Sequence, residues 1–96
     1  MAYAKRVDVN QSEIVKVFRN GGCSVFVTST VAGGFPDLVV GKNGKTHLVE
    51  IKSSRTAKFT PAQDLFILNW KGSRVKRIDG IDDAAALLSE LDESIR

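Results

Sequence analysis

Apolar residues recur along the chain at two spacings, and these spacings predict where helices and strands lie. Ile14, Val17 and Phe18 follow one another at helical spacing. The preceding run from Asn10 to Glu13 fits a capping box, so a helix is predicted to begin there, and the run 20–22, Asn-Gly-Gly, predicts its end. Residues 1–9 are expected to be a basic lead-in without a clear element.

Four shorter runs have the composition of strands. Residues 24–28 predict a first strand, and Pro36 fixes the backbone before a second strand that begins at Asp37. Residues 46–52 are apolar on both sides of the chain, which is typical of a central strand covered on both faces. Residues 74–78 predict a short, basic fourth strand.

Two more helices are predicted in the second half of the chain. Thr60 supplies an N-cap, Pro61 the first helical position and Gln63 the third, and this helix is expected to run to about Lys71. Its buried face is expected to comprise Gln63, Phe66, Ile67 and Trp70. A last helix is predicted after an Asp82 N-cap, with an apolar face of Ile81, Ala84, Ala85, Leu88 and Leu91.

The predicted order of elements is αβββαβα, in a single domain that spans residues 1–96. A strand, a helix and a strand in succession imply a parallel pair joined by a right-handed crossover. The predicted fold is therefore of the α/β class, with a four-stranded mixed sheet and helices on both of its faces.

The turn of the central hairpin decides which residues face each other. Asn43-Gly44 favours a type I′ turn, because both central residues of that turn need positive φ. With this two-residue loop Asp37 lies opposite Glu50, and alternation brings Lys52 to the same face. A three-residue loop with a bulge would shift the register by one residue and separate these groups.

Charge is distributed unevenly around a net value of +3. Residues 1–77 contain 13 Lys and Arg against 5 Asp and Glu, a net charge of +8, whereas residues 78–96 contain 1 Arg against 6 acids, a net charge of −5. The basic part suits a polyanion, since neutralising phosphates releases condensed counterions. A merely solvated basic surface is the alternative.

Composition also excludes several classes of protein. No apolar run approaches the ~18 residues of a membrane span, and the first residues lack a signal-peptide core, so we expect a cytoplasmic protein. The single Cys23 and the single His47 have no partners at zinc-ligand spacing. Cys23 is expected to be buried and His47, which alternates away from Glu50, to be a surface residue.

Two opposed carboxylates repel each other unless a positive charge compensates them. Mg²⁺ would do so, because it prefers carboxylate and carbonyl oxygens, and the backbone carbonyl of Ile51 can add one. Such an ion can polarise a phosphoryl oxygen and orient water, with Lys52 beside it as a base or as electrostatic support. The alternative is a structural Glu50–Lys52 ion pair, with Asp37 only starting a strand.

The same residues resemble a known nuclease motif. Pro36-Asp37, twelve further residues and Glu50-Ile51-Lys52 resemble the PD-(D/E)XK motif, and the predicted element order resembles the core of that superfamily. The segments 33–38, 49–53 and 59–63, together with an early helical glutamate, resemble the VRR-NUC family across nearly the whole chain.

This resemblance implies a Mg²⁺- or Mn²⁺-dependent DNA endonuclease that hydrolyses phosphodiester bonds. It implies that Asp37 and Glu50 bind metal, that Lys52 is the catalytic lysine and Gln63 supports the site, and that Glu13 reaches the metal directly or through water. Stand-alone members are often phage-encoded and resemble Holliday-junction resolvases, so branched DNA and a homodimer are expected. A non-catalytic nucleic-acid-binding module that retains the fold is the alternative.

Some of these residues have a competing role. Glu13 and Gln63 each occupy the third helical position of a capping box, where they can satisfy backbone donors instead, and one side chain is not expected to do both jobs. Several cations are expected to contact phosphates, and Arg55 and Lys58 to border the site because they follow Lys52. The full set is Arg55, Lys58, Lys42, Lys45, Arg74, Lys76 and Arg77.

Overall fold

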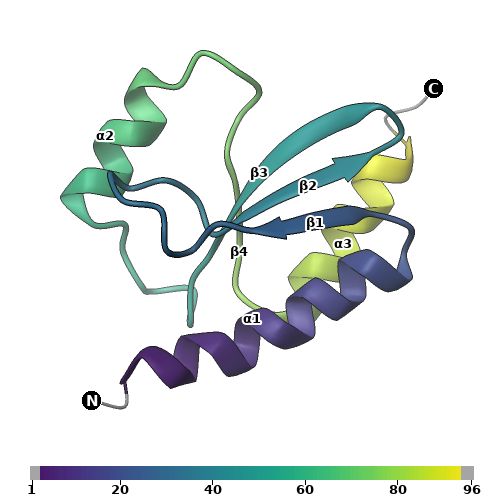
Figure 1. Ribbon diagram of the computed structural model, residues 1–96, viewed down its shortest axis with the longest axis horizontal. Coiled ribbons are helices and arrows are strands. Elements are labelled where there is room, and N and C mark those ends of the chain that lie inside the picture. The colour runs from purple at the N-terminus through teal and green to yellow at the C-terminus, as the bar shows by residue number, and fades with distance from the viewer. Residues whose placement is uncertain (1–2, 94–96) are drawn as a thin grey trace.

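The computed structural model describes residues 3–93, with side chains from residue 10 onward, and these residues form three helices and four strands (Figure 1). The helices are α1 (Tyr3–Asn20), α2 (Pro61–Asn69) and α3 (Ile81–Glu93). The strands are β1 (Ser24–Val27), β2 (Leu38–Lys42), β3 (Lys45–Ile51) and β4 (Lys76–Ile78). None of these helices, within the residues described, has the length and hydrophobicity that crossing a membrane requires.

The strands form one mixed sheet in the order β1-β2-β3-β4. β2 pairs antiparallel with both β1 and β3, whereas β4 pairs parallel with β3. α2 lies in the connection between the two parallel strands. The predicted αβββαβα order and the four-stranded mixed sheet of an α/β fold are therefore confirmed.

The β2–β3 hairpin closes through the two-residue turn that the sequence predicts. Asn43 has a φ of 55° and Gly44 a φ of 79°, the positive values that a type I′ turn needs. In the resulting register Leu38 pairs with Val49. Asp37 directly precedes Leu38 and Glu50 directly follows Val49. This register therefore sets the two predicted acids opposite each other.

The hydrophobic core lies between one face of the sheet and the helices α1 and α3. Ile14 and Phe18 of α1 are fully buried, and Ala84, Leu87 and Leu91 of α3 belong to the same cluster. The sheet contributes alternate residues to this cluster, namely Val25, Leu38, Val40, Val49, Ile51 and Ile78. Cys23 is buried in the cluster, as predicted.

The opposite face of the sheet is covered only in part. α2 stands on that side, at one end of the strands (Figure 1). All nine of its residues are described and none is buried. Gln63, Phe66 and Ile67 of the predicted face are half-buried, whereas Trp70, directly after the helix, is 41% exposed. Phe26, which points away from the core, is 75% exposed.

Both core helices differ in detail from the prediction. α1 begins at Tyr3, so the capping-box residues from Asn10 onward lie inside a continuous helix. The preceding run contains the good helix formers Ala, Lys and Arg, and continued helix competes with a local cap. α3 begins at Ile81, one residue before the predicted Asp82 cap. Its buried face includes Leu87, whereas Ile81 is 49% exposed and Ala85 is exposed.

His47 is buried, with 7% of its surface exposed, and not on the surface as predicted. It pairs with Val40, so its ring points to the same face as the core, beneath the helices. Both ring nitrogens lack a hydrogen-bond partner among the described residues, and burial lowers the pKa of the ring. The sequence correctly predicted that His47 and Glu50 point to opposite faces of the sheet. The face of His47, however, is the one that α1 and α3 cover.

Gly44→Ala is expected to destabilise the protein by about 1 kcal/mol, because a side chain at φ 79° brings Cβ close to the carbonyl oxygen. No described atom outside the neighbouring residues lies within 4 Å of the added Cβ, so the cost is that of the backbone alone. Gly41→Ala is the matched control: its φ is not positive, and the nearest atom to its added Cβ is at 3.8 Å. Urea denaturation measures both variants, and equal stabilities would contradict the type I′ turn.

Candidate functional site

Asp37 lies immediately before β2 and is held through both its backbone and its carboxylate. The N–H of Thr28 donates to the Asp37 carbonyl at 2.7 Å. The N–H of Ile51 donates to Asp37 Oδ2 at 2.9 Å. The preceding Pro36 is fully buried, and its carbonyl accepts a hydrogen bond from Thr28 Oγ1 at 2.8 Å. These contacts fix the carboxylate beside the end of β3.

Glu50 lies on β3 and is only 4% exposed. Its Oε2 accepts a hydrogen bond from Gln63 Nε2 at 2.7 Å, and Lys52 Nζ lies 3.8 Å from the same oxygen. Because its neighbours Val49 and Ile51 point into the core, Glu50 and Lys52 point to the opposite face of the sheet. The predicted convergence of Asp37, Glu50 and Lys52 on that face follows from the observed register and these contacts.

The pKa values of the two carboxylates, Asp37 and Glu50, are both raised. Burial, followed by the negative charge of Asp37, raises the pKa of Glu50 to about 7, against the opposing effect of Lys52. Burial also raises the pKa of Asp37, although the hydrogen bond from the Ile51 N–H acts in the opposite direction. Two carboxylates with raised pKa values are stabilised when one of them is protonated or when a cation binds between them.

Lys52 is positioned by acceptors and by an aromatic ring. Its Nζ donates to Gln63 Oε1 at 2.7 Å and lies 5.4 Å from the centre of the Phe59 ring. Only 12% of its side chain is exposed, and its backbone N–H donates to Ile78 of β4 at 2.9 Å. The ammonium group is thus held at the edge of the acid pair.

Gln63 performs two roles that the sequence suggested were alternatives. Its Oε1 accepts from the backbone N–H of Thr60 at 2.9 Å, which completes the capping box of α2, and also from Lys52 Nζ. Its Nε2 remains free of the cap and donates to Glu50. Both roles coexist because an amide oxygen has two lone pairs and the amide nitrogen two donors.

The donors at this site suit a hard divalent cation. The Asp37 and Glu50 carboxylates supply anionic oxygens, and the Ile51 carbonyl is directed toward Asp37, since the N–H and C=O of one residue point to the same neighbouring strand in an antiparallel ladder. Carboxylate and carbonyl oxygens with substrate phosphate are the ligands that Mg²⁺ and Mn²⁺ accept. A cation there would also relieve the repulsion that raises the Glu50 pKa.

Glu13 is not brought to this pair. Among the described residues no group of three or more His, Cys, Asp or Glu side chains could together hold a metal, and Glu13 is exposed on α1. The buried polar residue of that helix is instead Gln11, which is 7% exposed and whose Nε2 lies 3.5 Å from Ser29 Oγ. Ser29 follows Thr28, the residue that binds the Asp37 backbone.

Sequence inspection overlooked Gln11, although a signal for it was present. Gln11 shares the helical spacing of the buried residues Ile14, Val15 and Phe18, which lie three, four and seven positions further on. A polar residue in such a row is buried on folding. Its Oε1 has no hydrogen-bond partner among the described residues, so its amide has unused capacity near the Asp37 loop.

The predicted phosphate-binding cations fall into two groups. Lys42 is engaged within the molecule, because its Nζ donates to the Gly21 carbonyl at 2.7 Å and lies 3.2 Å from Asp92 Oδ1. Lys45, its partner across the hairpin, lies at the turn, at the end of β3 remote from Lys52. Neither lysine is placed beside the acid pair.

The second group surrounds the β4 edge of the sheet. A hollow of about 290 Å³ lies between β4 and α3, and its basic lining comprises Arg55, Arg74, Lys76 and Arg77. Arg77 Nη2 donates to the backbone carbonyls of Ser54 and Arg55, at 2.8 and 3.1 Å, and so ties the segment that leaves Lys52 to β4. Arg55 is 82% exposed and lies 3.7 Å from Asp83, which also lines the hollow. Lys58 is exposed on the same connection.

The fold and the acid–lysine arrangement together define the class, which is a nuclease-like domain of the PD-(D/E)XK type. A family model described as archaeal Holliday junction resolvase (Hjc) matches residues 2–64, a segment that includes the acid pair, Lys52 and Gln63. The chain therefore belongs to the Hjc family.

A solved structure shares the fold. It is described as a VRR_NUC domain, aligns with a TM-score of 0.69 and 22% sequence identity, and covers 85% of this chain and 92% of its own. This likeness agrees with the resemblance that the motifs indicated. No curated protein sequence matches the chain.

The raised pKa of Glu50 predicts how stability changes with pH in the absence of metal. Protonation of Glu50 stabilises the folded state below its ordinary pKa of 4.5, and this contribution is lost as pH rises through about 7. Relative to Glu50→Gln, the wild type should lose up to about 3 kcal/mol between pH 4.5 and 7.5, at 1.36 kcal/mol per unit. Urea denaturation in EDTA measures the difference, with the exposed Glu90→Gln as control, and parallel pH profiles would contradict a buried Glu50.

Proposed function

We propose that this protein is a Mg²⁺- or Mn²⁺-dependent DNA endonuclease that cleaves phosphodiester bonds in branched DNA and works as a homodimer inside the cell. The observation that carries the proposal is the Asp37–Glu50 pair, which is held at the end of a hairpin with Lys52 fixed beside it by Gln63. The nuclease-like family supports the same conclusion.

A catalytic role explains what a binding role does not. Partly buried carboxylates are unfavourable unless they are paired or bind a cation, and facing a polyanion they repel it. A module that only bound DNA would be better served by apolar or basic residues at Asp37 and Glu50. A metal-dependent hydrolase needs both acids, and this favours the enzyme over the non-catalytic alternative.

Asp37, Glu50 and the Ile51 carbonyl would hold the metal, with Glu13 left as a residue that reaches it only through water or a rearrangement of α1. When bound, a divalent cation polarises a phosphoryl oxygen and activates water for in-line attack. The hydrogen bond from the Ile51 N–H to Asp37 Oδ2 orients the Asp37 carboxylate for such a role.

Lys52 acts as electrostatic support in this proposal and not as a base. Its Nζ faces two acceptors, Gln63 Oε1 and Glu50 Oε2, and is therefore held as a hydrogen-bond donor. An ammonium group in this position stabilises the negative charge that develops on the phosphoryl oxygens, and it can give a proton to the leaving oxygen. Gln63 keeps it oriented.

The basic residues beside Lys52 would guide the DNA backbone. Arg55 and Lys58 lie on the segment that follows Lys52, and Arg74 and Lys76 line the adjacent hollow. Arg77 ties this segment to β4 and pairs in register with Glu50, so phosphates bound along the segment would pass close to the acid pair. Such contacts position the DNA without reading its sequence, which agrees with recognition of DNA shape.

The first test is cleavage of defined DNA substrates. Purified protein is incubated with a four-way junction, a flap and a linear duplex, with Mg²⁺, Mn²⁺ or EDTA. We expect metal-dependent cleavage that is strongest on branched DNA and at least about 10²-fold slower for Lys52→Ala, the usual loss when one electrostatic stabiliser is removed. Lys16→Ala, on exposed α1 surface, is the control.

Equal product from Lys52→Ala and wild type, or no cleavage of any substrate with metal, would rule out the enzyme. Gel-shift measurements with Ca²⁺ separate binding from cleavage. DNA binding that Lys52→Ala retains, without turnover by the wild type, would favour the non-catalytic module instead.

Metal binding itself is expected to stabilise the protein. At pH 8, above the raised Glu50 pKa, a cation at 100 times its Kd adds about 2.7 kcal/mol to the free energy of unfolding. This corresponds to a rise in Tm of roughly 11–22 °C for a domain of this size. Thermal melts in Mn²⁺ and in EDTA measure the shift. Asp37→Asn and Glu50→Gln should abolish it and Glu90→Gln should keep it, whereas an equal shift in all four proteins would place the metal elsewhere.

A further inference from the structure

Phe26 of β1 exposes its aromatic ring on the sheet face opposite the core. The preceding residue, Val25, belongs to the core cluster, so Phe26 points to the other face, where it is 75% exposed. Among the residues whose side chains are described, its ring contacts no other ring and no cation. Packing of the fold therefore does not account for a large aromatic side chain at this position.

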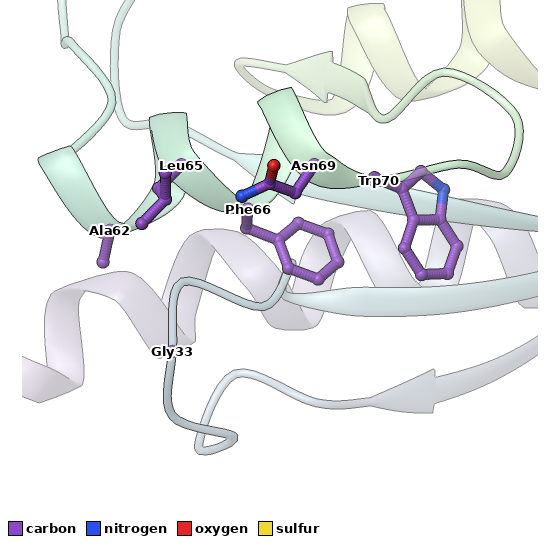
Figure 2. Close-up of a pocket in the computed structure, with 6 residues that line it drawn as sticks. All are labelled: Gly33, Ala62, Leu65, Phe66, Asn69 and Trp70. Carbon is purple, nitrogen blue, oxygen red and sulfur yellow. The ribbon is translucent and has the colours of Figure 1, made fainter.

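The aromatic residues around α2 differ from Phe26 in this respect. Phe66 stacks on Trp70 with ring centres 5.4 Å apart, and Phe35 meets Phe66 edge-on at 5.3 Å. Figure 2 shows the Phe66 and Trp70 rings on the side of α2 where the loop carrying Gly33 lies. These rings contact one another within the molecule, whereas the Phe26 ring is left for a ligand.

The register of the sheet places Phe26 beside the acid pair. Phe26 pairs with Val39, and Val39 pairs with Leu48. Asp37 lies two residues before Val39 and Glu50 two residues after Leu48, so both acids point to the face that carries Phe26. Two residues of a strand span about 7 Å. Phe26 is therefore one row of side chains away from the acids, on the edge strand.

A hollow extends from Phe26 along the same face. It measures about 220 Å³ and is lined by Ser24, Val25, Phe26, Val39, Gly41 and Thr46. The small residues Ser24, Gly41 and Thr46 lie side by side across three strands, so a flat group can approach the sheet next to the ring. The exposed hydroxyls of Ser24 and Thr46 can hydrogen-bond to its edge. A planar ligand with apolar faces and polar edges fits this surface.

A cation lies at the neighbouring edge of the sheet. Arg19 Nη2 donates to the Val25 carbonyl at 3.1 Å, and β1 is an edge strand, so the guanidinium lies at the free edge directly beside Phe26. A guanidinium has five N–H donors, and the remaining donors can bind an anion. An aromatic ring and a cation in this arrangement are complementary to the base and the phosphate of one nucleotide.

We propose that Phe26 stacks on an unpaired nucleobase close to the cleaved phosphate while Arg19 binds a neighbouring phosphate, and that this contact produces a preference for branched DNA. The proposal rests on the DNA endonuclease function put forward above and names the part of the substrate that β1 recognises. An apolar protein surface is the competing occupant. The acids on one side and Arg19 on the other favour a ligand that carries charged groups.

The same contact distinguishes branched DNA from a linear duplex. Inside a duplex both faces of every base are covered by its neighbours, whereas a flap or a branch point offers unpaired bases. The basic residues beside β4 and the Phe26 ring beside β1 lie toward opposite edges of the sheet, with the acid pair between them. A strand whose phosphates contact the β4 side can therefore cross the acids and place a base on Phe26.

The test measures DNA binding by fluorescence anisotropy with Ca²⁺, on a duplex with a single-stranded flap and on a linear duplex of equal length. Phe26→Ala should raise the Kd for the flap about 10-fold, the usual loss for one base–aromatic stack, and leave the Kd for the linear duplex unchanged. Phe26→Trp should retain the wild-type values. Ile81→Ala, at a site 49% exposed on α3, is the matched control, and circular dichroism checks that each variant is folded.

Salt dependence separates stacking from charge. Phe26→Ala should leave the slope of log Kd against log salt concentration on the flap unchanged, because stacking releases no counterion. Arg19→Gln should reduce that slope by about 0.7–0.9, the contribution of one phosphate contact. Between roughly 50 and 200 mM salt both slopes are measurable.

Three results would overturn the proposal: wild-type affinity of Phe26→Ala for the flap, an equal loss on flap and linear duplex, or a wild-type salt slope for Arg19→Gln. Sedimentation velocity without DNA examines the competing occupant. Self-association that Phe26→Ala abolishes, with flap affinity intact, would assign the ring to a protein interface instead. Because none of these measurements involves cleavage, a protein that binds the flap through Phe26 but cuts no substrate would retain this proposal and reject the enzyme.

Discussion

The register of the β2–β3 hairpin is the constraint on which the other features of the site depend. The Asn43-Gly44 turn leaves two residues in the loop, and a side-chain period of two means that a shift of one residue would move every side chain to the other face. With the observed register, Asp37 reaches the end of β3 and accepts from the Ile51 N–H, while Glu50 points away from the core. A local backbone preference of two residues therefore decides whether the two carboxylates meet.

The second constraint is the Gln63 amide, which links this hairpin to α2. A single side chain closes the capping box of the helix, accepts from Lys52 and donates to Glu50. The start of the helix and the orientation of the lysine are consequently one structural unit. The helix is attached to the rest of the domain through these polar contacts and through the edge-on contact of Phe66 with Phe35, and none of its residues is fully buried.

Burial of the acid pair changes its protonation and its affinity for cations. The core is built on one side of the sheet by α1 and α3, and the acids lie on the other side, where partial cover still removes most water from Glu50. Removal of water and the neighbouring Asp37 together raise the Glu50 pKa toward neutrality. The same conditions that make two carboxylates unfavourable alone make them good ligands for a divalent cation.

The sequence by itself determined the element order, the hairpin register and the acid–lysine set, because turn chemistry, alternation and motif spacing are local properties of the chain. Only the tertiary structure decided what covers each element. Local patterns gave no means of knowing that α1 continues back to Tyr3, that His47 is buried, or that Trp70 is exposed beside an uncovered α2. The acid–lysine site could be assembled from pairings within one hairpin, whereas burial depends on which distant segments pack together, and that is set by the whole fold.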